Sequence, residues 1–416
     1  MSLRRTLVIA EGQLGDLLLL VPALRALKAG NTTMQLTVLV VQRRPGTPGV
    51  ADAAHNEPLL HALFHEGGYA GSSDAAHTDP LLHEAGYGGT ASVVKHLPYV
   101  DRVLELDRMR LRTLRGPARL RGEWDVIRTL RRERFDAVIC TFPEDRFVLW
   151  ARASGARRRV GQYAQPLRRL LTDTPHILKE EQGVLRYYLS LAAALGVEGG
   201  DERTEFAVPS SARDWARQFV ASHCPGTTPL VAIHPGASGD YKIWPPEHFS
   251  ALAAKLRAYG VRVILCGGEM DDEIMRGITT VHPSKIPVAH TGSDLTRLGA
   301  LFAESDLCVT NDSGPRHLAI AVGARSVALF RRHHDRAWGV YAESDSCATV
   351  RTEEECPVCP RGVCHDRRRD GERFGCVCVR MISVETVYER VMRMLSVSSS
   401  GTPRTSFDGT DQPAQA

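Results

Sequence analysis

The chain has 416 residues, enough for two domains of ordinary size, and 43% hydrophobic with 24% charged residues is typical of a globular protein. No apolar run approaches the roughly 20 residues that cross a bilayer, since Asp16, Pro22 and Arg25 interrupt the most apolar segment, residues 14–29. A net charge of +4 is too small to predict nucleic-acid binding. The N-terminus lacks a signal-peptide cleavage pattern, so we expect a cytoplasmic protein.

The first half alternates short apolar runs with amphipathic ones. Strands are expected at residues 6–10, 36–41, 137–141 and 158–162. Helices are expected at residues 14–29, 145–154 and 176–196. A polar stretch, residues 199–211, then has the composition of a connector.

The second half repeats the alternation with shorter connections. Strands are expected at residues 230–234, 262–266, 288–291, 307–310 and 326–330. Helices are expected at residues 246–259, 295–304 and 315–322. Such alternation predicts parallel sheets covered by helices on both faces, and two such halves predict a cleft between them.

Two segments stand apart from this pattern. Residues 52–71 are echoed by residues 74–89, and the duplication carries His55, His61, His65, His77 and His83. Two copies are too few for a solenoid, so residues 52–89 are interpreted as a surface insertion. A metal site there is the alternative, although no short His–His spacing defines a ligand set. The polar, small-residue tail at residues 396–416 is expected to be disordered.

Arginines crowd the chain between residues 102 and 134. The set includes Arg108, Arg110, Arg112, Arg115, Arg119, Arg121, Arg128, Arg131 and Arg132. The simplest interpretation is a solvated helical face. The alternative is a surface for a phosphorylated or membrane-bound acceptor.

Two segments of the second half combine a strand, a stop at small or polar residues, and a helix. These are IHPGASGDYKIWPPEHF at residues 233–249 and VTNDSGPRHLAIAVGARSVALF at residues 309–330. Ligands of open α/β sheets bind beyond the carboxyl ends of parallel strands, and helix N-termini bind anions. Both segments therefore predict an anionic ligand, which we interpret as a nucleotide sugar.

Together with LVIAEGQLGDLLLLVPALRALK at residues 7–28, these segments resemble the signature segments of glycosyltransferase family 9. That family contains the heptosyltransferases of lipopolysaccharide core assembly, and the resemblance extends more weakly over most of residues 5–395. It implies an α/β fold of GT-B architecture, with two Rossmann-like domains facing a central cleft. It also implies an inverting transferase.

The resemblance divides the chain into functional parts. We expect an acceptor domain at residues 1–198, a linker region at 199–228, a nucleotide-sugar-binding domain at 229–395 and the tail at 396–416. The expected donor is a nucleotide sugar, with ADP-heptose as the implied compound. The expected acceptor is the lipopolysaccharide core or another cell-surface or lipid-linked glycan, which indicates peripheral contact with the inner face of the cytoplasmic membrane. No nucleic-acid partner is expected.

Asp16 is the expected catalytic residue. It lies in GQLGDLLLL, where the first strand gives way to the first helix, and sugar transfer to a hydroxyl needs a carboxylate that removes its proton. An aspartate at a helix start can also be only a favourable charge in the first turn. The resemblance implies catalysis, because the aspartate of the family's GD motif is taken as the base. Gly12 and Gly15 would let the backbone approach the acceptor closely.

The first donor-binding residues lie in and after the segment at residues 233–249. Lys242 could neutralise a departing diphosphate, although an ordinary exposed loop lysine is the alternative; the resemblance implies a place at the donor phosphates. Ser238 is a second candidate phosphate contact. Glu269 follows a strand, where a carboxylate can accept hydrogen bonds from ribose hydroxyls, as the resemblance also implies. The neighbouring acids that compete for this role are Asp271, Asp272 and Glu273.

The motif NDSGPRH supplies the other donor-binding candidates. The amides of Ser313 and Gly314 are at a helix start, where they can bind phosphate. Asp312 either caps the helix or orients the donor. His317 either reaches the phosphates or packs in the core. The resemblance implies a donor role for Asp312, Ser313 and Gly314, and we include His317 with them.

The chain departs from the family pattern after residue 330. The family usually continues with a glycine, whereas this chain has Arg331, Arg332, His333 and His334. Such a basic loop could grip the diphosphate or change the choice of donor. No Asp-x-Asp pair is present to hold a divalent metal on a sugar diphosphate. We therefore expect a metal-independent mechanism with no required cofactor.

Five cysteines cluster in ECPVCPRGVCHDRRRDGERFGCVCVRM. Clustered thiols in a cytosolic protein suggest metal or redox chemistry more than disulfides. One hypothesis is a structural zinc held by Cys356, Cys359, Cys364 and Cys376. An iron–sulfur site is a weaker hypothesis, and buried free thiols are the interpretation that we prefer.

Two alternatives to heptosyl transfer remain open. One is a transferase of the same fold with a different nucleotide-sugar donor and acceptor, which the basic residues 331–334 would permit. The other is a non-catalytic nucleotide- or metal-binding protein that uses the duplicated histidine segment and the cysteine cluster.

Overall fold

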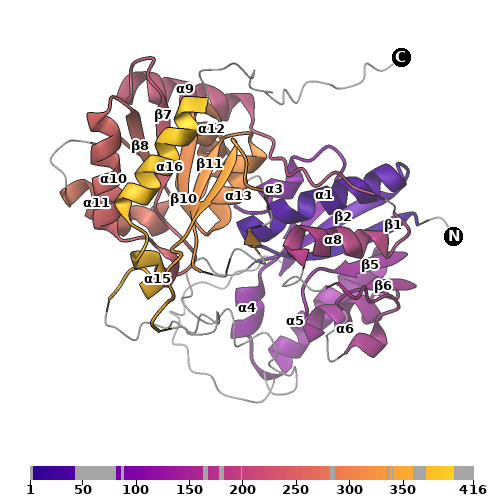
Figure 1. Ribbon diagram of the computed structural model, residues 1–416. Helices are drawn as coiled ribbons and strands as arrows, with labels where there is room; N and C mark the ends of the chain where they lie inside the picture. Colours follow the sequence, from indigo (N-terminus) through magenta and orange to yellow (C-terminus); the bar gives the residue numbers. More distant parts are fainter. Residues whose placement is uncertain are drawn as a thin grey trace, which may run out of the picture.

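The computed structural model describes residues 3–42, 81–85, 89–162, 167–177, 182–197, 199–281, 286–332, 334, 338–339, 341–358 and 372–397. Two six-stranded sheets, one in each half of the chain, form two α/β units that lie side by side (Figure 1). The expected α/β architecture with two Rossmann-like sheets is confirmed. None of the helices in these ranges has both the length and the hydropathy of a membrane span.

The first sheet has the strand order β3-β4-β2-β1-β5-β6. Its strands are β1 (Arg5–Glu11), β2 (Gln35–Val41), β3 (Leu82–Glu84), β4 (Arg102–Leu106), β5 (Ala137–Cys140) and β6 (Arg158–Val160). Neighbours are parallel except for the antiparallel pair β3 and β4. The central strand β1 is buried from Thr6 to Glu11, and helices cover both of its faces.

Two groups of helices cover this first sheet. They are α1 (Leu14–Gly30), α3 (Ser92–Lys95), α4 (Arg108–Thr113), α5 (Gly116–Arg132), α6 (Asp145–Ala153), the 3-10 turn η1 (Arg168–Leu170) and α8 (Val184–Ala193). Helices α1 and α8 share a core with the face of β1 that carries Val8, whereas α4, α5 and α6 share one with the face that carries Leu7. The alternation of side chains along a strand produces these two separate cores.

The second sheet has the strand order β12-β11-β10-β7-β8-β9 and is parallel throughout. Its strands are β7 (Leu230–His234), β8 (Arg262–Gly267), β9 (Val288–His290), β10 (Leu307–Asn311), β11 (Ser326–Leu329) and β12 (Cys347–Val350). The helices are α9 (Ser210–His223), α10 (Pro246–Ala258), α11 (Asp272–Val281), α12 (Leu295–Glu304), α13 (Gly314–Ala321), α15 (Val377–Arg380) and α16 (Val384–Val397).

The strand order reverses between β1 and β5 in the first sheet and between β7 and β10 in the second. Such reversals mark the ligand-binding crevices of open α/β sheets. Helix α1 follows β1 and helix α13 follows β10, so both helices begin at a reversal. The two helices lie against each other in the middle of the molecule (Figure 1). One apolar core runs from α1 and α8 into α12 and α13, and therefore joins the two units.

The starts of α1 and α13 approach each other so closely that glycine is needed on both. A Cβ atom on Gly314 would lie 2.8 Å from the Cβ of Leu14. A Cβ atom on Gly15 would lie 3.0 Å from Cδ2 of His317. Side chains at these two positions would push the helix starts apart, so Gly15 serves helix contact here.

The predicted elements of the second half are confirmed, each to within a residue or two. In the first half the helix predicted over residues 176–196 is confirmed only as α8 from Val184 to Ala193, and residues 178–181 of the prediction lie outside the described residues. Gly183 precedes α8 with φ of 84°, a left-handed conformation that a helix cannot continue through. The arginine-rich stretch is not one helical face but is divided among β4, α4 and α5.

Some sequence predictions fall partly on segments that the structure does not describe. Most of the duplicated insertion lies outside the described residues, and within it β3 at residues 82–84 pairs with β4. The tail lies outside them from residue 398. The linker predicted at residues 199–228 contains α9, which packs on α12 of the second unit.

Candidate functional site

Asp16 lies in the first turn of α1 and is 5% exposed. The hydroxyl of Tyr188, on α8, donates a hydrogen bond of 2.8 Å to its Oδ1 atom. Burial, and next the charge of Asp16, raise the pKa of Tyr188 well above its ordinary value, so the proton stays on the tyrosine. Among the described residues no donor contacts the second oxygen, Oδ2. The carboxylate is thus held by one oxygen, which leaves the other for a hydroxyl of a substrate.

A buried group of charges adjoins this position, and the sequence analysis did not identify it. Glu11 ends β1 and is 1% exposed, with its Oε1 atom 3.6 Å from Nη1 of Arg108. Arg108, in the first turn of α4, also donates a bond of 2.9 Å from Nη2 to Glu144. Burial of such charges is tolerable only when they are paired. The carboxyl edge of the first sheet therefore holds a buried, paired group of charges near Asp16.

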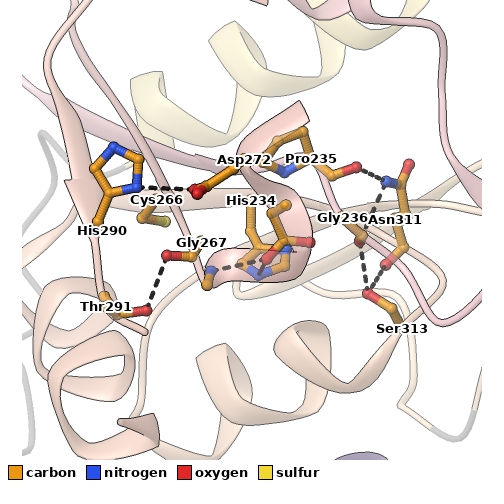
Figure 2. Close-up of polar contacts among 12 residues, drawn as sticks. His234, Pro235, Gly236, Cys266, Gly267, Asp272, His290, Thr291, Asn311 and Ser313 are labelled. Atoms are coloured by element: carbon orange, nitrogen blue, oxygen red, sulfur yellow. Dashed lines mark hydrogen bonds and ion pairs between the residues drawn. The ribbon is translucent and has the colours of Figure 1, made fainter. Parts of the chain in front are cut away.

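On the second unit, the loop at residues 235–243 follows β7 and is held by a buried side chain of β10. The amide of Asn311 donates a bond of 2.6 Å to the carbonyl of Pro235, and its Oδ1 atom accepts one of 3.1 Å from the backbone of Trp244. Figure 2 shows the bond from Asn311 to Pro235 beside the contact of Ser313 Oγ with the carbonyl of Gly236. Trp244 is fully buried and packs against His248 and Phe249 of α10.

The loop places Lys242 beside Asp312. The Nζ atom of Lys242 lies 3.6 Å from Oδ2 of Asp312, and His334 contacts the same carboxylate through Nδ1. Burial alone would raise the pKa of Asp312, but Lys242 and His334 together hold it well below its usual range. Asp312 is therefore a buried anion between two basic side chains. Its carboxylate binds them instead of capping α13, so the capping alternative is excluded.

The basic residues that depart from the family pattern lie next to this pair. Arg331 is 5% exposed, and its guanidinium stacks 4.8 Å from the ring centre of Tyr241, next to Lys242. Burial lowers the pKa of His334, while the charge of Asp312 opposes this shift. Lys242 and the guanidinium of Arg331 thus place positive charge near the start of α13.

The start of α13 has the free backbone amides that an anion site needs. Ser313 is the residue before the helix and has extended backbone angles, φ −155° and ψ 172°. No side chain among the described residues caps the first amides of the helix. The Oγ atom of Ser313 instead lies 3.4 Å from the carbonyls of Gly236 and Asn311. The N–H groups of Ser313 and Gly314 remain available to phosphate oxygens, whereas Pro315 has none and that of Arg316 donates to the carbonyl of Ser313.

His317, on α13, contacts residues of both units. It is 3% exposed and lies beside Gly15 of α1, while its Nδ1 atom is 3.1 Å from the hydroxyl of Tyr341. Burial, and next the neighbouring Arg316, lower its pKa from 6.5 to about 3, so the imidazole is neutral. Arg316 itself is fully buried between the rings of Phe330 and Tyr341. His317 therefore packs at the junction of the helices, as a neutral group beside the donor motif.

The four acids after β8 differ in their partners. Asp271 accepts a bond of 2.9 Å from the amide of Gly268, Asp272 pairs with His290 at 3.0 Å (Figure 2), and Glu273 pairs with Arg373. Glu269 is exposed at the start of the 3-10 turn η3 (Glu269–Asp271) and has no such partner among the described residues. Glu269 is thus the acid of this group that stays available to a ligand.

The other predicted contact, Ser238, is exposed in the loop before the 3-10 turn η2 (Asp240–Lys242). Gly12 is buried at the end of β1, where its amide donates a bond of 2.9 Å to the carbonyl of Val41. Gly12 therefore continues the sheet ladder, and it lies one residue beyond Glu11.

The cysteine cluster supports the lysine loop from behind. Cys356, Cys376 and Cys378 are buried free thiols, and the Sγ atoms of the last two are 3.3 Å apart. The amide of Cys376 donates a bond of 2.8 Å to the carbonyl of Tyr241. Cys359 and Cys364 lie outside the described residues, and the part of the chain that the structure describes holds no group of three or more metal-ligating side chains.

The model of glycosyltransferase family 9 (heptosyltransferase) matches residues 124–365, which is more than half of the chain. The chain belongs to glycosyltransferase family 9. Among curated relatives, the lipopolysaccharide heptosyltransferase 3 of Escherichia coli is 25% identical over 289 residues, or 67% of this chain and 80% of the relative. The lipopolysaccharide core heptosyltransferase OpsX of Haemophilus influenzae is 26% identical over 201 residues, or 47% of this chain and 54% of the relative.

Solved structures of the family share the fold. The family 9 glycosyl transferase of Veillonella parvula superposes with a TM-score of 0.69 at 20% identity, covering 95% of this chain and 99% of its own. The E. coli ADP-heptose LPS heptosyltransferase II superposes with a TM-score of 0.65 at 17% identity, covering 95% of this chain and 100% of its own. The expected GT-B architecture of this family 9 transferase is confirmed.

The hydrogen bond between Tyr188 and Asp16 is expected to contribute measurably to stability. Tyr188→Phe leaves a buried carboxylate without its donor, so the free energy of unfolding should fall by about 1.5–3 kcal/mol. The measurement is urea unfolding. Tyr187→Phe is the matched control, because it removes another buried hydroxyl on α8 and leaves the bond to Asp16 in place. Equal losses in the two variants would contradict the assignment.

The neutral state of His317 predicts how stability depends on pH. The unfolded chain binds a proton on this histidine below its ordinary pKa of 6.5, whereas the folded chain binds it only near its pKa of about 3. Stability should therefore fall as the pH drops below 6.5, by up to about 1.4 kcal/mol per pH unit from this group.

The test compares melting temperatures at several pH values for the wild type, His317→Gln and the exposed-site control His223→Gln. His317→Gln should flatten the pH dependence below pH 6.5, and His223→Gln should leave it close to that of the wild type. A pH dependence of His317→Gln identical to that of the wild type would contradict the prediction.

Proposed function

We propose that this family 9 transferase moves heptose from ADP-heptose to an acceptor in the lipopolysaccharide core, with inversion at the sugar carbon. The observation that carries the proposal is the contact of the starts of α1 and α13, which would bring the buried carboxylate of Asp16 close to phosphates bound at the start of α13. The curated relatives carry names of lipopolysaccharide heptosyltransferases. The solved E. coli WaaC structures hold ADP and an ADP-fluoroheptose.

We propose that residues 1–198 bind the acceptor and residues 229–395 bind the donor. Asp16 would take the proton of the acceptor hydroxyl while the hydroxyl oxygen attacks the anomeric carbon. The bond from that carbon to the diphosphate breaks in the same step, and the nucleotide leaves with the electron pair. One displacement of this kind inverts the configuration of the carbon.

The donor half of the site would stabilise the leaving nucleotide. The amides of Ser313 and Gly314 would donate hydrogen bonds to phosphate oxygens. Lys242 would exchange part of its contact with Asp312 for the diphosphate, which adds a negative charge at the same place. Glu269 would accept hydrogen bonds from the ribose, and Ser238 would contact a phosphate. His317 would hold the junction of α1 and α13 beneath the diphosphate.

We also propose that the transfer needs no metal ion. Lys242, Arg331 and the helix amides supply the positive charge that a divalent cation supplies in other transferases. A structural zinc on Cys356, Cys359, Cys364 and Cys376 would be separate from this chemistry, because the backbone of Cys376 supports the lysine loop through Tyr241.

A second candidate is the same reaction with a different nucleotide sugar. Arg331 and His334 favour it, because they line the donor side with two basic side chains where the family usually has a glycine. In either case, the acceptor would be met at the inner face of the cytoplasmic membrane through peripheral contact.

The donor is identified by thermal shift with a panel of nucleotides and nucleotide sugars. A ligand that binds only the folded state stabilises it, by about 2.7 kcal/mol when its concentration is 100 times its Kd. The melting temperature rises as a result. We expect ADP and ADP-heptose to stabilise the wild type, and Lys242→Ala to lose most of the shift. Lys255→Ala, on the outer helix α10, is the matched control and should keep it.

The same protein is then tested for turnover of the stabilising donor, with and without EDTA. Stabilisation by UDP, GDP or dTDP sugars alone would show that the donor is not ADP-heptose, and the proposed mechanism would still apply. Loss of turnover in EDTA would contradict metal independence. The absence of any nucleotide response would contradict transfer and favour the binding-protein alternative.

A further inference from the structure

The outward face of α5 is an unusual surface. Among the described residues four large apolar side chains are exposed, and two of them lie one turn apart on this helix: Leu120 at 59% and Trp124 at 57%. Helix α5 covers the first sheet at the side of the molecule away from the second unit (Figure 1). Its opposite side is the buried one, with Gly122, Val126 and Leu130. The exposed pair therefore has no partner within the chain's own core.

Arginines surround this pair. At about 100° per residue, Leu120, Trp124, Arg121, Arg128 and Arg131 fall within about 100° of the circumference of the helix. In the part of the chain that the structure describes, none of these arginines forms an ion pair. Trp124 also borders a hollow whose other lining residues are Ile127, Arg128, Arg131, Arg132 and Arg134. Two acids adjoin Trp124 in sequence: Asp125 lies at the edge of the face, and Glu123 pairs with Arg146 of α6.

We propose that the outward face of α5 docks on the surface of a membrane that contains anionic lipids. A helix with Trp and Leu at the centre of an arginine-rich face suits the boundary between headgroups and acyl chains. The tryptophan and leucine enter that boundary, and the arginines bind lipid phosphates around them. The hollow beside Trp124 would hold one headgroup phosphate.

The charge pattern decides among the possible occupants. A second copy of the chain would bring the same arginines face to face in a two-fold contact, where they repel. A soluble polyanion would pair with the arginines but would leave Leu120 and Trp124 in water. An anionic bilayer provides partners for both the charges and the apolar side chains.

The surface also lies on the side that suits the acceptor. Helix α5 follows α4, whose Arg108 contacts Glu11 at the end of β1. Docking through α5 would therefore bring the acceptor side of the first unit near lipid. The inference deepens the proposed function and rests on it for the identity of the acceptor as a lipid-linked glycan.

The test is co-sedimentation of the full chain with vesicles, without donor or acceptor. Vesicles of phosphatidylcholine alone are compared with vesicles that contain about 30 mol% phosphatidylglycerol. The wild type should bind the anionic vesicles at low salt, bind the neutral ones weakly, and lose binding as salt rises. Because no glycan is present, failure here would not bear on transfer, and failure of the donor assay would not bear on docking.

Paired variants locate the surface. Arg128→Gln with Arg131→Gln should weaken partitioning about 30-fold, whereas the control Arg276→Gln with Arg393→Gln, exposed arginines of the second unit with the same change in charge, should leave it within about threefold. Trp124→Ala should weaken it roughly tenfold, and Tyr259→Ala, an exposed aromatic elsewhere, should not.

Quenching by brominated lipids checks insertion, since it should be stronger for the wild type than for Trp124→Phe. The proposal is overturned if the wild type ignores anionic vesicles, or if the control pairs lose as much binding as the α5 variants. It is equally overturned if Trp124→Ala binds like the wild type, because the arginines would then form only a polyanion site. Matching melting temperatures among the variants exclude unfolding as the cause.

Discussion

The close approach of two helix starts, at Gly15 of α1 and Gly314 of α13, is the contact on which the site depends. It works because neither position has a side chain, and because an apolar core continues from one unit into the other behind it. Both helices turn the positive ends of their dipoles toward the same space. Asp16 and Asp312 place negative charge there, and Lys242, Arg331 and the two helix starts place positive charge beside it. The helix starts and these cations favour an anionic ligand such as a donor diphosphate.

In the second unit, the buried carboxylate of Asp312 is already paired with basic side chains before any ligand binds. Asp312 is buried but remains ionised because Lys242 and His334 contact it. A buried ion pair contributes little net stability, since its desolvation offsets its attraction. What the arrangement provides is a preorganised pair of cations, Lys242 and Arg331, which is in place before the nucleotide leaves. Asn311 and the backbone of Cys376 keep the lysine loop in place from two sides.

The sequence predicted the elements that are apolar over their full length and the motifs that follow them. Parallel strands end at one edge of a sheet, so Lys242 and Asp312 could be expected to meet from their positions after two such strands. Tyr188 could not be found this way, because its partner Asp16 is 172 residues away and the helix pattern shows only that the tyrosine is buried. The pairing of Glu11 with Arg108 could not be predicted either, because the two residues are far apart in the sequence and Arg108 is one of many arginines in its segment.

The central claim is that Asp16 takes the acceptor proton next to a donor site built by other residues. The most direct measurement compares turnover and donor affinity in Asp16→Asn, which keeps the size of the side chain and its contact with Tyr188. The account predicts turnover lower by about 10²–10⁴-fold, the usual contribution of a general base, with the Kd of the nucleotide sugar unchanged. Turnover like that of the wild type, or loss of donor binding in step with turnover, would contradict it.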